Sequence, residues 1–245
     1  EGIYSREIQN LFFKNRKKND EISQKHLDLA ASVQAAFELA LENMLKWCRT
    51  EYPDVNVLNL SGGCALNVTA NGKIHSKGIF KKINITPASN DAGCSIGSVI
   101  ELINKKNILI ESNSIKNPYL GATFEDHQII NAFKKLNLTL PTFIPTEKLI
   151  DIVSSELANK KIVAWFQGSS EFGPRALGNR SFLADPRDDQ IREVLNEKIK
   201  KRELFRPFAP SILDFKLNEF FHTDTSSPYM SIVAKVKKDK KRLIP

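Results

Sequence analysis

The chain has 245 residues, of which 41% are hydrophobic and 26% charged, the balance of an ordinary globular protein with one large domain or two small ones. No stretch approaches the roughly 20 apolar residues that a membrane-spanning helix requires, and no signal-peptide core is present. The formal net charge of +8 lies largely in plain lysine-rich runs without interleaved aromatic residues, which argues against nucleic-acid binding.

The first predicted element is a long amphipathic helix over residues 20–50, where apolar side chains recur at three- or four-residue steps. Residues 55–60 have the pattern of a short strand and lead straight into Ser61-Gly62-Gly63. A second short strand is predicted over residues 83–85, and a helix over residues 95–104. Strand, tight loop and helix thus occur twice, which predicts a layered α/β domain.

Asn, Ser, Thr and Pro become frequent between residues 107 and 145, which predicts a linker or a domain crossover. Thr146 is suited to cap a helix that runs through residue 159. The strongest strand candidate of the chain follows at residues 162–166. Another helix is predicted over residues 188–201, and beyond Phe221 the pattern indicates no clear element.

Residues 60–67, LSGGCALN, are the first segment that could carry chemistry. Adjacent glycines let the backbone turn sharply and bring its N–H groups close to a ligand. A helix that follows such a loop adds the positive end of its dipole, which attracts phosphate. A Ser-Gly-Gly turn is also common as a plain turn, and neither the P-loop nor the dinucleotide spacing is present. From the residues alone, both interpretations stay open.

The second candidate is Asp91, in the segment Asn90-Asp91-Ala92-Gly93 that follows the second predicted strand. A carboxylate at the C-terminal end of a strand, held by a glycine turn, is well placed to ligate a metal. The alternative is that Asp91 caps the next helix, which is a very common role for aspartate. Residue chemistry alone favours the cap.

The third candidate is the segment 167–187, QGSSEFGPRALGNRSFLADPR, directly after the strongest predicted strand. It is a predicted loop in which Gly173-Pro174 fixes a rigid bend, and its anion-binding side chains are Arg175, Arg180, Ser181 and Arg187. Guanidinium groups bind phosphate or carboxylate oxygens through planar, bidentate contacts. The alternative is internal neutralisation by Glu171 and Asp185. Arg206 could extend the same site.

The cysteines and histidines indicate no metal centre of their own. Cys48, Cys64 and Cys94 are odd in number and lack CxxC spacing, so we expect reduced thiols in a cytoplasmic protein rather than a disulfide framework or a zinc site. The four histidines include no HxxxH or HExxH pair. The absence of a GxSxG segment also disfavours a Ser-His-Asp hydrolase.

Three segments stand in order along the chain: LNLSGGCALNVTANGKI, ASNDAGCSIGSVIEL and WFQGSSEFGPRALGNRSFLADPR. Together they resemble the carbamoyltransferase family that includes the nodulation protein NodU, cephalosporin carbamoyltransferase and the tobramycin enzyme TobZ. The resemblance covers nearly the whole chain, and GPRALGNRS is its most specific part.

The resemblance implies an α/β fold in two parts. Residues 1–115 would be the C-terminal half of an actin-like ATPase (Kae1-like) domain, residues 116–145 a linker or crossover, and residues 146–245 the first part of a YrdC-like domain. The implied activity is ATP-dependent O-carbamoyl transfer from carbamoyl phosphate, through carbamoyl adenylate, to a hydroxyl of a sugar or natural product. A divalent metal, iron or magnesium, is the implied cofactor, and a homodimer is an implied option.

The resemblance also implies roles for single residues. The nucleotide-binding residues would be Ser61, Gly62, Gly63, Asn67 and Arg206, and the catalytic ones Arg175, Arg180 and Ser181. Asp91 matches the carboxylate that ligates the metal, which reverses the preference for a cap.

Two departures stand against this pattern. The histidine pair that completes the family's metal site is missing, so we expect a chain that begins midway through the first domain and is nearly inactive alone. Ser169 stands where a basic residue commonly follows Gln-Gly in the family.

Three other functions compete with this interpretation. A tRNA threonylcarbamoyl-transfer protein would share part of the motif set, and its tRNA binding would depend steeply on salt. A non-catalytic nucleotide-binding module would keep the loops without the reaction. An actin-like sugar kinase has no obvious use for GPRALGNRS.

Overall fold

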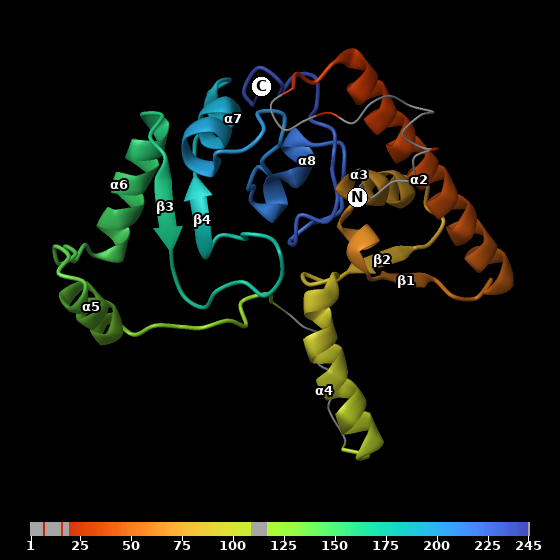
Figure 1. The fold of residues 1–245 in the computed structure, drawn as a ribbon, viewed down its shortest axis with the longest axis horizontal. Helices are drawn as coiled ribbons and strands as arrows, with labels where there is room; N and C mark the ends of the chain where they lie inside the picture. The colour runs from red at the N-terminus through yellow and green to blue at the C-terminus, as the bar shows by residue number, and fades with distance from the viewer. Residues whose placement is uncertain (1–6, 8–15, 17–19, 109–116, 245) are drawn as a thin grey trace. The chain divides into compact units, whose positions relative to one another are not determined.

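The computed structural model of the protein describes residues 7, 16, 20–108 and 117–244. The chain forms two compact units, residues 1–53 and 54–245. The described part of the first unit is dominated by helix α2, Gln24–Glu51, drawn in red to orange in Figure 1. The predicted long helix is confirmed, although it begins at Gln24, because the backbone N–H of Ser23 donates to the His26 ring nitrogen at 3.0 Å and caps the first turn.

The first half of the second unit contains the predicted strand, loop and helix twice. Its elements are β1 (Val57–Leu60), the 3-10 helix η1 (Gly63–Leu66), α3 (Val68–Ser76), β2 (Lys82–Ile85), the 3-10 helix η2 (Asp91–Gly93) and α4 (Cys94–Lys105). Strands β1 and β2 pair in parallel, with Val57 opposite Lys82 and Leu60 opposite Ile85. Parallel pairing requires a crossover, which α3 supplies. The loops that follow the two strands therefore leave the same edge of the sheet.

The second half of this unit is built around an antiparallel pair, visible in Figure 1. Its elements are α5 (Asp126–Lys135), α6 (Thr146–Ala158), β3 (Val163–Phe166), β4 (Arg180–Leu183), α7 (Ile191–Val194), the π-helical turn η3 (Leu195–Lys200), the 3-10 turn η4 (Asp214–Lys216) and α8 (Leu217–Phe220). In the pair β3–β4, Val163 lies opposite Leu183 and Phe166 opposite Arg180. The fold is thus a mixed α/β arrangement of helices and two small sheets, as predicted at that level.

Three details differ from the sequence-based expectations. Helix α5 lies inside the segment expected to be a linker or crossover. Strand β4 lies inside the predicted loop 167–187, because its pairing with β3 is a long-range contact that local residue preferences do not reveal. The helix expected over residues 188–201 is a short α-turn followed by the π-helical turn η3, and it begins only at Ile191.

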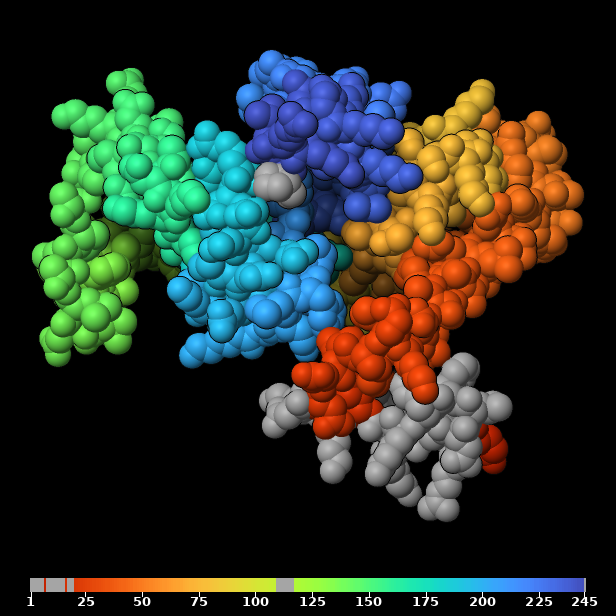
Figure 2. All heavy atoms as spheres, turned by 90° about the horizontal axis from the view of Figure 1, so that it is seen from above, coloured from red at the N-terminus to blue at the C-terminus, as the bar shows by residue number. Residues whose placement is uncertain are grey.

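The C-terminal segment packs against α3 and buries its inner face. The Asn71 side-chain amide donates to the backbone oxygens of Ala65, at 2.8 Å, and Ser231, at 2.9 Å. A Cβ on Gly72 would lie 2.6 Å from the backbone oxygen of Val233, so only glycine permits this approach. Figure 2 shows the blue C-terminal segment beside the gold residues of α3.

Two further expectations from the sequence can be compared with the described residues. Cys48, Cys64 and Cys94 are all free thiols, as predicted. None of the helices in the described ranges combines the length and the apolar content that crossing a bilayer demands.

Candidate functional site

The loop after β1, here called the SGG loop (residues 61–67), lies against the turn after β2, the NDAG turn (residues 89–93). Gly62 has a φ of +89°, in the left-handed region that favours glycine, and its N–H donates to the Ser89 oxygen at 2.7 Å. The Ser61 hydroxyl donates to the same oxygen at 3.4 Å. Two motifs that are 28 positions apart in sequence therefore touch at one edge of the β1–β2 sheet.

Asn67 connects the SGG loop to helix α3. Its side-chain oxygen accepts a hydrogen bond from the Ala70 N–H at 3.0 Å, which caps the nine-residue helix. Ser61, Gly62 and Gly63 are exposed. The loop thus presents an open glycine backbone immediately before a helix N-terminus, a combination that favours anionic groups.

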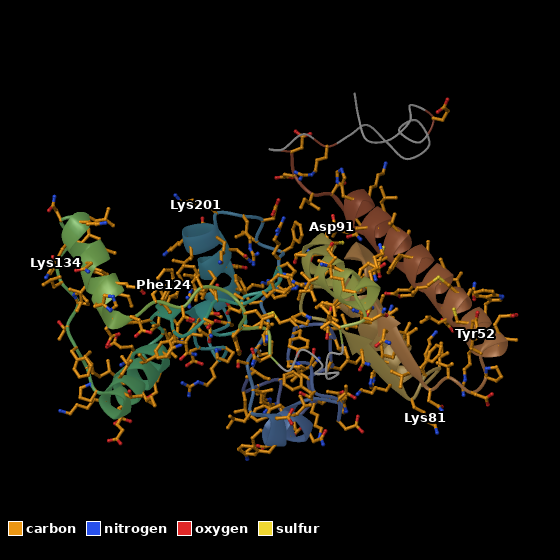
Figure 3. The ribbon with its side chains drawn as sticks, turned by 90° about the horizontal axis from the view of Figure 1, so that it is seen from below. Tyr52, Lys81, Asp91, Phe124, Lys134 and Lys201 are labelled. Carbon is orange, nitrogen blue, oxygen red and sulfur yellow. The ribbon has the colours of Figure 1, made fainter. Side chains whose placement is uncertain are left out.

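Asp91, labelled in Figure 3, is the first residue of η2 and is exposed. It caps neither adjoining helix, because the N-cap residues of η2 and α4 are Asn90 and Gly93. The neighbouring Ser89 hydroxyl and Asn90 side-chain oxygen are buried without a hydrogen-bond partner. A carboxylate beside an unpartnered amide oxygen offers oxygen ligands of the kind that magnesium accepts. Nevertheless, the described residues contain no group of three or more His, Cys, Asp or Glu side chains with metal-binding geometry.

The third motif forms the arginine loop (residues 167–181), which is organised by Glu171. One carboxylate oxygen of Glu171 accepts hydrogen bonds from the N–H groups of Leu177 and Asn179, both at 2.8 Å, and of Arg180 at 3.1 Å. Burial by itself raises the pKa of Glu171, but the backbone hydrogen bonds together outweigh burial and lower the pKa below its usual value. Glu171 therefore holds the loop as a charged carboxylate instead of neutralising an arginine.

Two glycines shape the arginine loop. Gly173 has a φ of +120°, and a Cβ there would lie 2.3 Å from the Pro87 backbone oxygen, so the loop presses against the segment that leads to the NDAG turn. Gly178 has a φ of +107°, and its N–H donates to the Ser181 hydroxyl at 2.9 Å. Ser181 thus supports the loop through its oxygen.

Arg175 joins the arginine loop to the SGG loop. Its guanidinium donates to the Leu66 backbone oxygen at 3.3 Å. Together with the contact between Ser61 and Ser89 and the approach of Gly173 to Pro87, this bond brings all three sequence motifs into one site. The three motifs can be identified from the sequence, but only the structure shows that they are in contact.

Arg180 is almost fully engaged by the protein itself. The guanidinium donates to four backbone oxygens: from Nη1 to Gln167 (2.7 Å) and Asn179 (2.8 Å), and from Nη2 to Gly168 (3.0 Å) and Ala122 (3.4 Å). Its carbon Cζ lies 3.5 Å from the centroid of the Phe166 ring. Arg180 thus fastens β4 to the end of β3 and to the segment around Ala122.

The remaining arginines of this region have carboxylate partners. Arg187 forms a fork with the buried Asp185, with Nε 2.9 Å from both carboxylate oxygens and Nη2 2.5 Å from Oδ2. These side-chain hydrogen bonds lower the pKa of Asp185. Arg206, predicted to contact the nucleotide, is paired with Glu203 at 2.8 Å. Internal neutralisation therefore applies to Arg187 and Arg206, whereas in the described part of the chain Arg175 and Arg180 pair with no carboxylate.

A segment that sequence reasoning missed, the flanking segment (residues 118–124), lines the arginine loop. Its hydrogen bonds run from Gly121 N–H to Ser170 O (2.9 Å), from Ser170 N–H to Ala122 O (3.2 Å), from Phe172 N–H to Pro118 O (2.6 Å) and from Tyr119 Oη to Leu177 O (2.9 Å). Phe124, labelled in Figure 3, stacks obliquely on Phe166, with ring centroids 6.3 Å apart. No local pattern indicates these contacts, because both partners are irregular backbone far apart in sequence.

Ser169 also contacts the flanking segment. Its hydroxyl lies 2.6 Å from the Thr123 hydroxyl, and its backbone oxygen accepts a hydrogen bond from the Asn179 side chain at 2.7 Å. At this position the family resemblance predicts a basic side chain. The structure instead has the small hydroxyl of Ser169, paired with the hydroxyl of Thr123. The binding roles expected of the site residues stay predictions.

Two family models match the chain. The model described as Carbamoyltransferase N-terminus matches residues 2–100, and the model described as Carbamoyltransferase C-terminus matches residues 154–245. The SGG loop and the NDAG turn lie in the first match, and the arginine loop lies in the second.

Curated proteins show the same similarity. The chain is 37% identical to the nodulation protein NolNO of Sinorhizobium fredii, over 94% of the chain and 34% of the relative. It is 36% identical to the nodulation protein NolO of Bradyrhizobium diazoefficiens, over 92% of the chain and 41% of the relative. It is 34% identical to the 3'-hydroxymethylcephem-O-carbamoyltransferase of Amycolatopsis lactamdurans, over 82% of the chain and 36% of the relative.

The chain thus spans about a third to two fifths of the length of these curated relatives. Both family models and the named relatives agree with the resemblance inferred from the three motifs. The chain belongs to the carbamoyltransferase family.

Proposed function

We propose that this chain carries the nucleotide and carbamoyl phosphate sites of an ATP-dependent O-carbamoyltransferase. The single observation that carries the proposal is the convergence of three motifs, through the contacts of Ser61 with Ser89, Gly173 with Pro87 and Arg175 with Leu66. A site built from a glycine loop, a carboxylate turn and an arginine loop suits a reaction in which two phosphorylated substrates meet.

In this proposal, water hydrolyses carbamoyl phosphate to carbamate and inorganic phosphate. A carbamate oxygen then attacks the α-phosphorus of ATP, the bond from that phosphorus to the β-phosphate oxygen breaks, and carbamoyl adenylate and pyrophosphate form. The oxygen of an acceptor hydroxyl then attacks the carbamoyl carbon, the bond from that carbon to the adenylate oxygen breaks, and AMP leaves while the hydroxyl loses its proton. The developing charge on the leaving phosphate calls for fixed cationic donors and N–H groups. The half-buried guanidinium of Arg175 and the exposed backbone of Gly63 are such donors.

A divalent metal, iron or magnesium, belongs to the same proposal. The exposed carboxylate of Asp91 and the unpartnered side-chain oxygen of Asn90 fit a hard cation, although they supply only part of a ligand set. When bound, the metal would neutralise phosphate charge. The NDAG turn would hold it beside the SGG loop, to which the Ser89 oxygen is hydrogen-bonded.

The acceptor is proposed to be a hydroxyl of a sugar or natural product. One relative is named as acting on a 3'-hydroxymethylcephem, which is a hydroxyl-bearing small molecule. The division into an actin-like ATPase part and a YrdC-like part, a cytoplasmic location and a homodimer also stay proposals. The two-part division follows from the motif resemblance, and the cytoplasmic location follows from the cysteines, which lack a disulfide or zinc pattern.

The proposal is tested with the full-length protein that contains this chain, using carbamoyl phosphate with a labelled carbamoyl carbon, ATP, magnesium or ferrous iron, and a panel of sugars. We expect label in an acceptor only when ATP is present. Transfer of label to tRNA would instead favour the threonylcarbamoyl-transfer alternative. Absence of both labelled acceptor and ATP-dependent adenylate exchange would overturn the proposal.

A further inference from the structure

We propose that the two arginines of the arginine loop divide their work: Arg175 binds a substrate phosphate, and Arg180 is a positioning residue that holds the loop. This inference rests on the proposed function, because it assumes that the loop meets a phosphorylated ligand. The motif alone predicts that both arginines bind an anion. The inference gives Arg180 a positioning role in place of that expected role.

The donors of Arg180 are the first argument. A guanidinium carries five N–H donors in one plane, two on each terminal nitrogen and one on Nε. In Arg180 both terminal nitrogens donate to backbone oxygens, at distances of 2.7 to 3.4 Å. One face of the group is covered by the Phe166 ring. Arg180 could form the usual bidentate contact with a phosphate only if these hydrogen bonds were broken.

The carbonyl partners of Arg180 show what its bonds achieve. Gln167 and Gly168 lie at the start of the loop, directly after β3, and Asn179 lies at its end, directly before β4. Ala122 belongs to the flanking segment. A single charged group therefore gathers both ends of the loop and its neighbour through charge-assisted hydrogen bonds. This is the arrangement expected of a residue that fixes the loop's shape.

Arg175 has the opposite character. Its only hydrogen bond within the described residues is the single 3.3 Å contact to Leu66, which leaves most of its donors available. No carboxylate of the described chain neutralises it, because the bonding oxygen of Glu171 is occupied by three backbone N–H groups. Leu66 ends η1, one residue before the cap of α3, so the guanidinium stands where the SGG loop and the helix N-terminus also favour an anion.

The experiment uses inorganic phosphate as the probe and follows its binding to the full-length protein by calorimetry. The matched variants are Arg175→Lys and Arg180→Lys, which keep the charge but lose the planar fork. We expect Arg175→Lys to weaken phosphate binding about ten-fold, the effect of losing one bidentate contact, with an unchanged melting temperature. We expect Arg180→Lys to lower the melting temperature while phosphate affinity changes less than about three-fold.

Amide hydrogen exchange within the arginine loop supplies a second measurement. A side chain that stabilises another part of the protein would not change the exchange rates of these amides. In Arg180→Lys, exchange at Leu177, Asn179 and Gln167, whose N–H donates to the Asn179 oxygen at 3.1 Å, should accelerate, and in Arg175→Lys it should not. If Arg180→Lys does not fold, Phe166→Leu replaces it. This variant removes the ring beneath the guanidinium, together with its contact with Phe124, and should accelerate the same amides.

The proposal is overturned if Arg175→Lys leaves phosphate affinity unchanged, if Arg180→Lys loses phosphate binding with unchanged exchange, or if the unaltered protein binds no phosphate. Because phosphate binding is measured without carbamoyl transfer, the two proposals can fail separately. Arg175-dependent phosphate binding in a protein that transfers no carbamoyl group would support the division of work while overturning the proposed function.

Discussion

The guanidinium of Arg175 donates to the backbone oxygen of Leu66, which precedes it by 109 positions. This bond joins the segment matched by the C-terminal family model to the segment matched by the N-terminal one. The SGG loop and the arginine loop are therefore parts of one site, and a change in either loop is expected to be felt in the other.

The first prediction concerns the close approach of Gly173 to Pro87. Gly173→Ala places a Cβ on a residue with φ of +120° and within 2.3 Å of the Pro87 oxygen. We expect the free energy of unfolding to fall by about 2 kcal/mol or more, since a positive φ alone costs about 1–2 kcal/mol for a residue with a side chain. Urea denaturation measures the loss.

Gly63→Ala is the matched control for this change, because a Cβ on Gly63 would meet nothing within 4 Å. It should leave the urea midpoint close to that of the unaltered protein. Equal midpoints for Gly173→Ala and Gly63→Ala would contradict the packing of the arginine loop against Pro87.

The second prediction concerns the charge of Glu171. Glu171→Gln keeps an acceptor oxygen but removes the charge that strengthens hydrogen bonds from three N–H groups. Hydrogen bonds to charged groups contribute about 1.5–3 kcal/mol, so we expect a loss of about 1–2 kcal/mol in stability. Amide exchange of Leu177 and Asn179 should accelerate. As a control, Glu101→Gln alters only an exposed helical pair with Lys105 and should have little effect.

The pH dependence of this effect has a definite sign. The pKa of Glu171 is lowered in the folded protein, so its stabilising contribution is present above the unfolded pKa and is lost as pH falls through the folded pKa. The stability difference between the unaltered protein and Glu171→Gln should therefore be largest near neutral pH and shrink in acid. A difference that grows on acidification would contradict this prediction.

The third prediction concerns Arg187, whose side-chain hydrogen bonds lower the pKa of the buried Asp185. Arg187→Gln removes the stabilisation of the charged carboxylate, which in the unaltered protein exists above the unfolded pKa of Asp185 and disappears below its folded pKa. We expect a lower urea midpoint at neutral pH and convergence of the two proteins in strong acid. Midpoints that differ equally at both pH values would show that the fork does not act through charge.

The fourth prediction concerns the proposed metal. Asp91 is exposed, so Asp91→Asn should leave the melting temperature unchanged. Carbamoyl transfer by the full-length protein should fall at least about ten-fold, and the metal concentration required for half activity should rise, because an anionic oxygen ligand is lost. Asp189→Asn, at another exposed aspartate, is the control. An unchanged metal requirement in Asp91→Asn would remove Asp91 from the metal site.

The local patterns of the sequence predicted the elements whose apolar period is strong. Helix α2 and strand β1 follow from their own residues, and parallel pairing with β2 then places the SGG loop beside the NDAG turn. Strand β4 was missed because Arg180 and Ser181 are not typical strand residues. Its formation depends on long-range pairing with β3 and on the stacking of Arg180 on Phe166.

The candidate site was predictable as a set of motifs but not as an arrangement. The sequence places Arg175 and Arg180 five positions apart, with identical chemistry. Which one is free for a ligand depends on carbonyl oxygens such as those of Gln167 and Ala122, whose direction is set by tertiary structure. The sequence also offers Glu171 as a partner for arginine, but the turn at Gly178 directs three backbone N–H groups to its carboxylate instead.

The contact between Gly72 and Val233 has a consequence for how this protein can change over time. Helix α3 and the C-terminal segment belong to the matches of two separate family models, yet no side chain fits between them. Any residue larger than glycine at position 72 would require a compensating shift of the backbone at Val233, and the amide of Asn71 adds a second constraint through Ala65 and Ser231. The two halves are therefore expected to be inherited together, and a chimera that takes each half from a different relative should lose stability at this contact first.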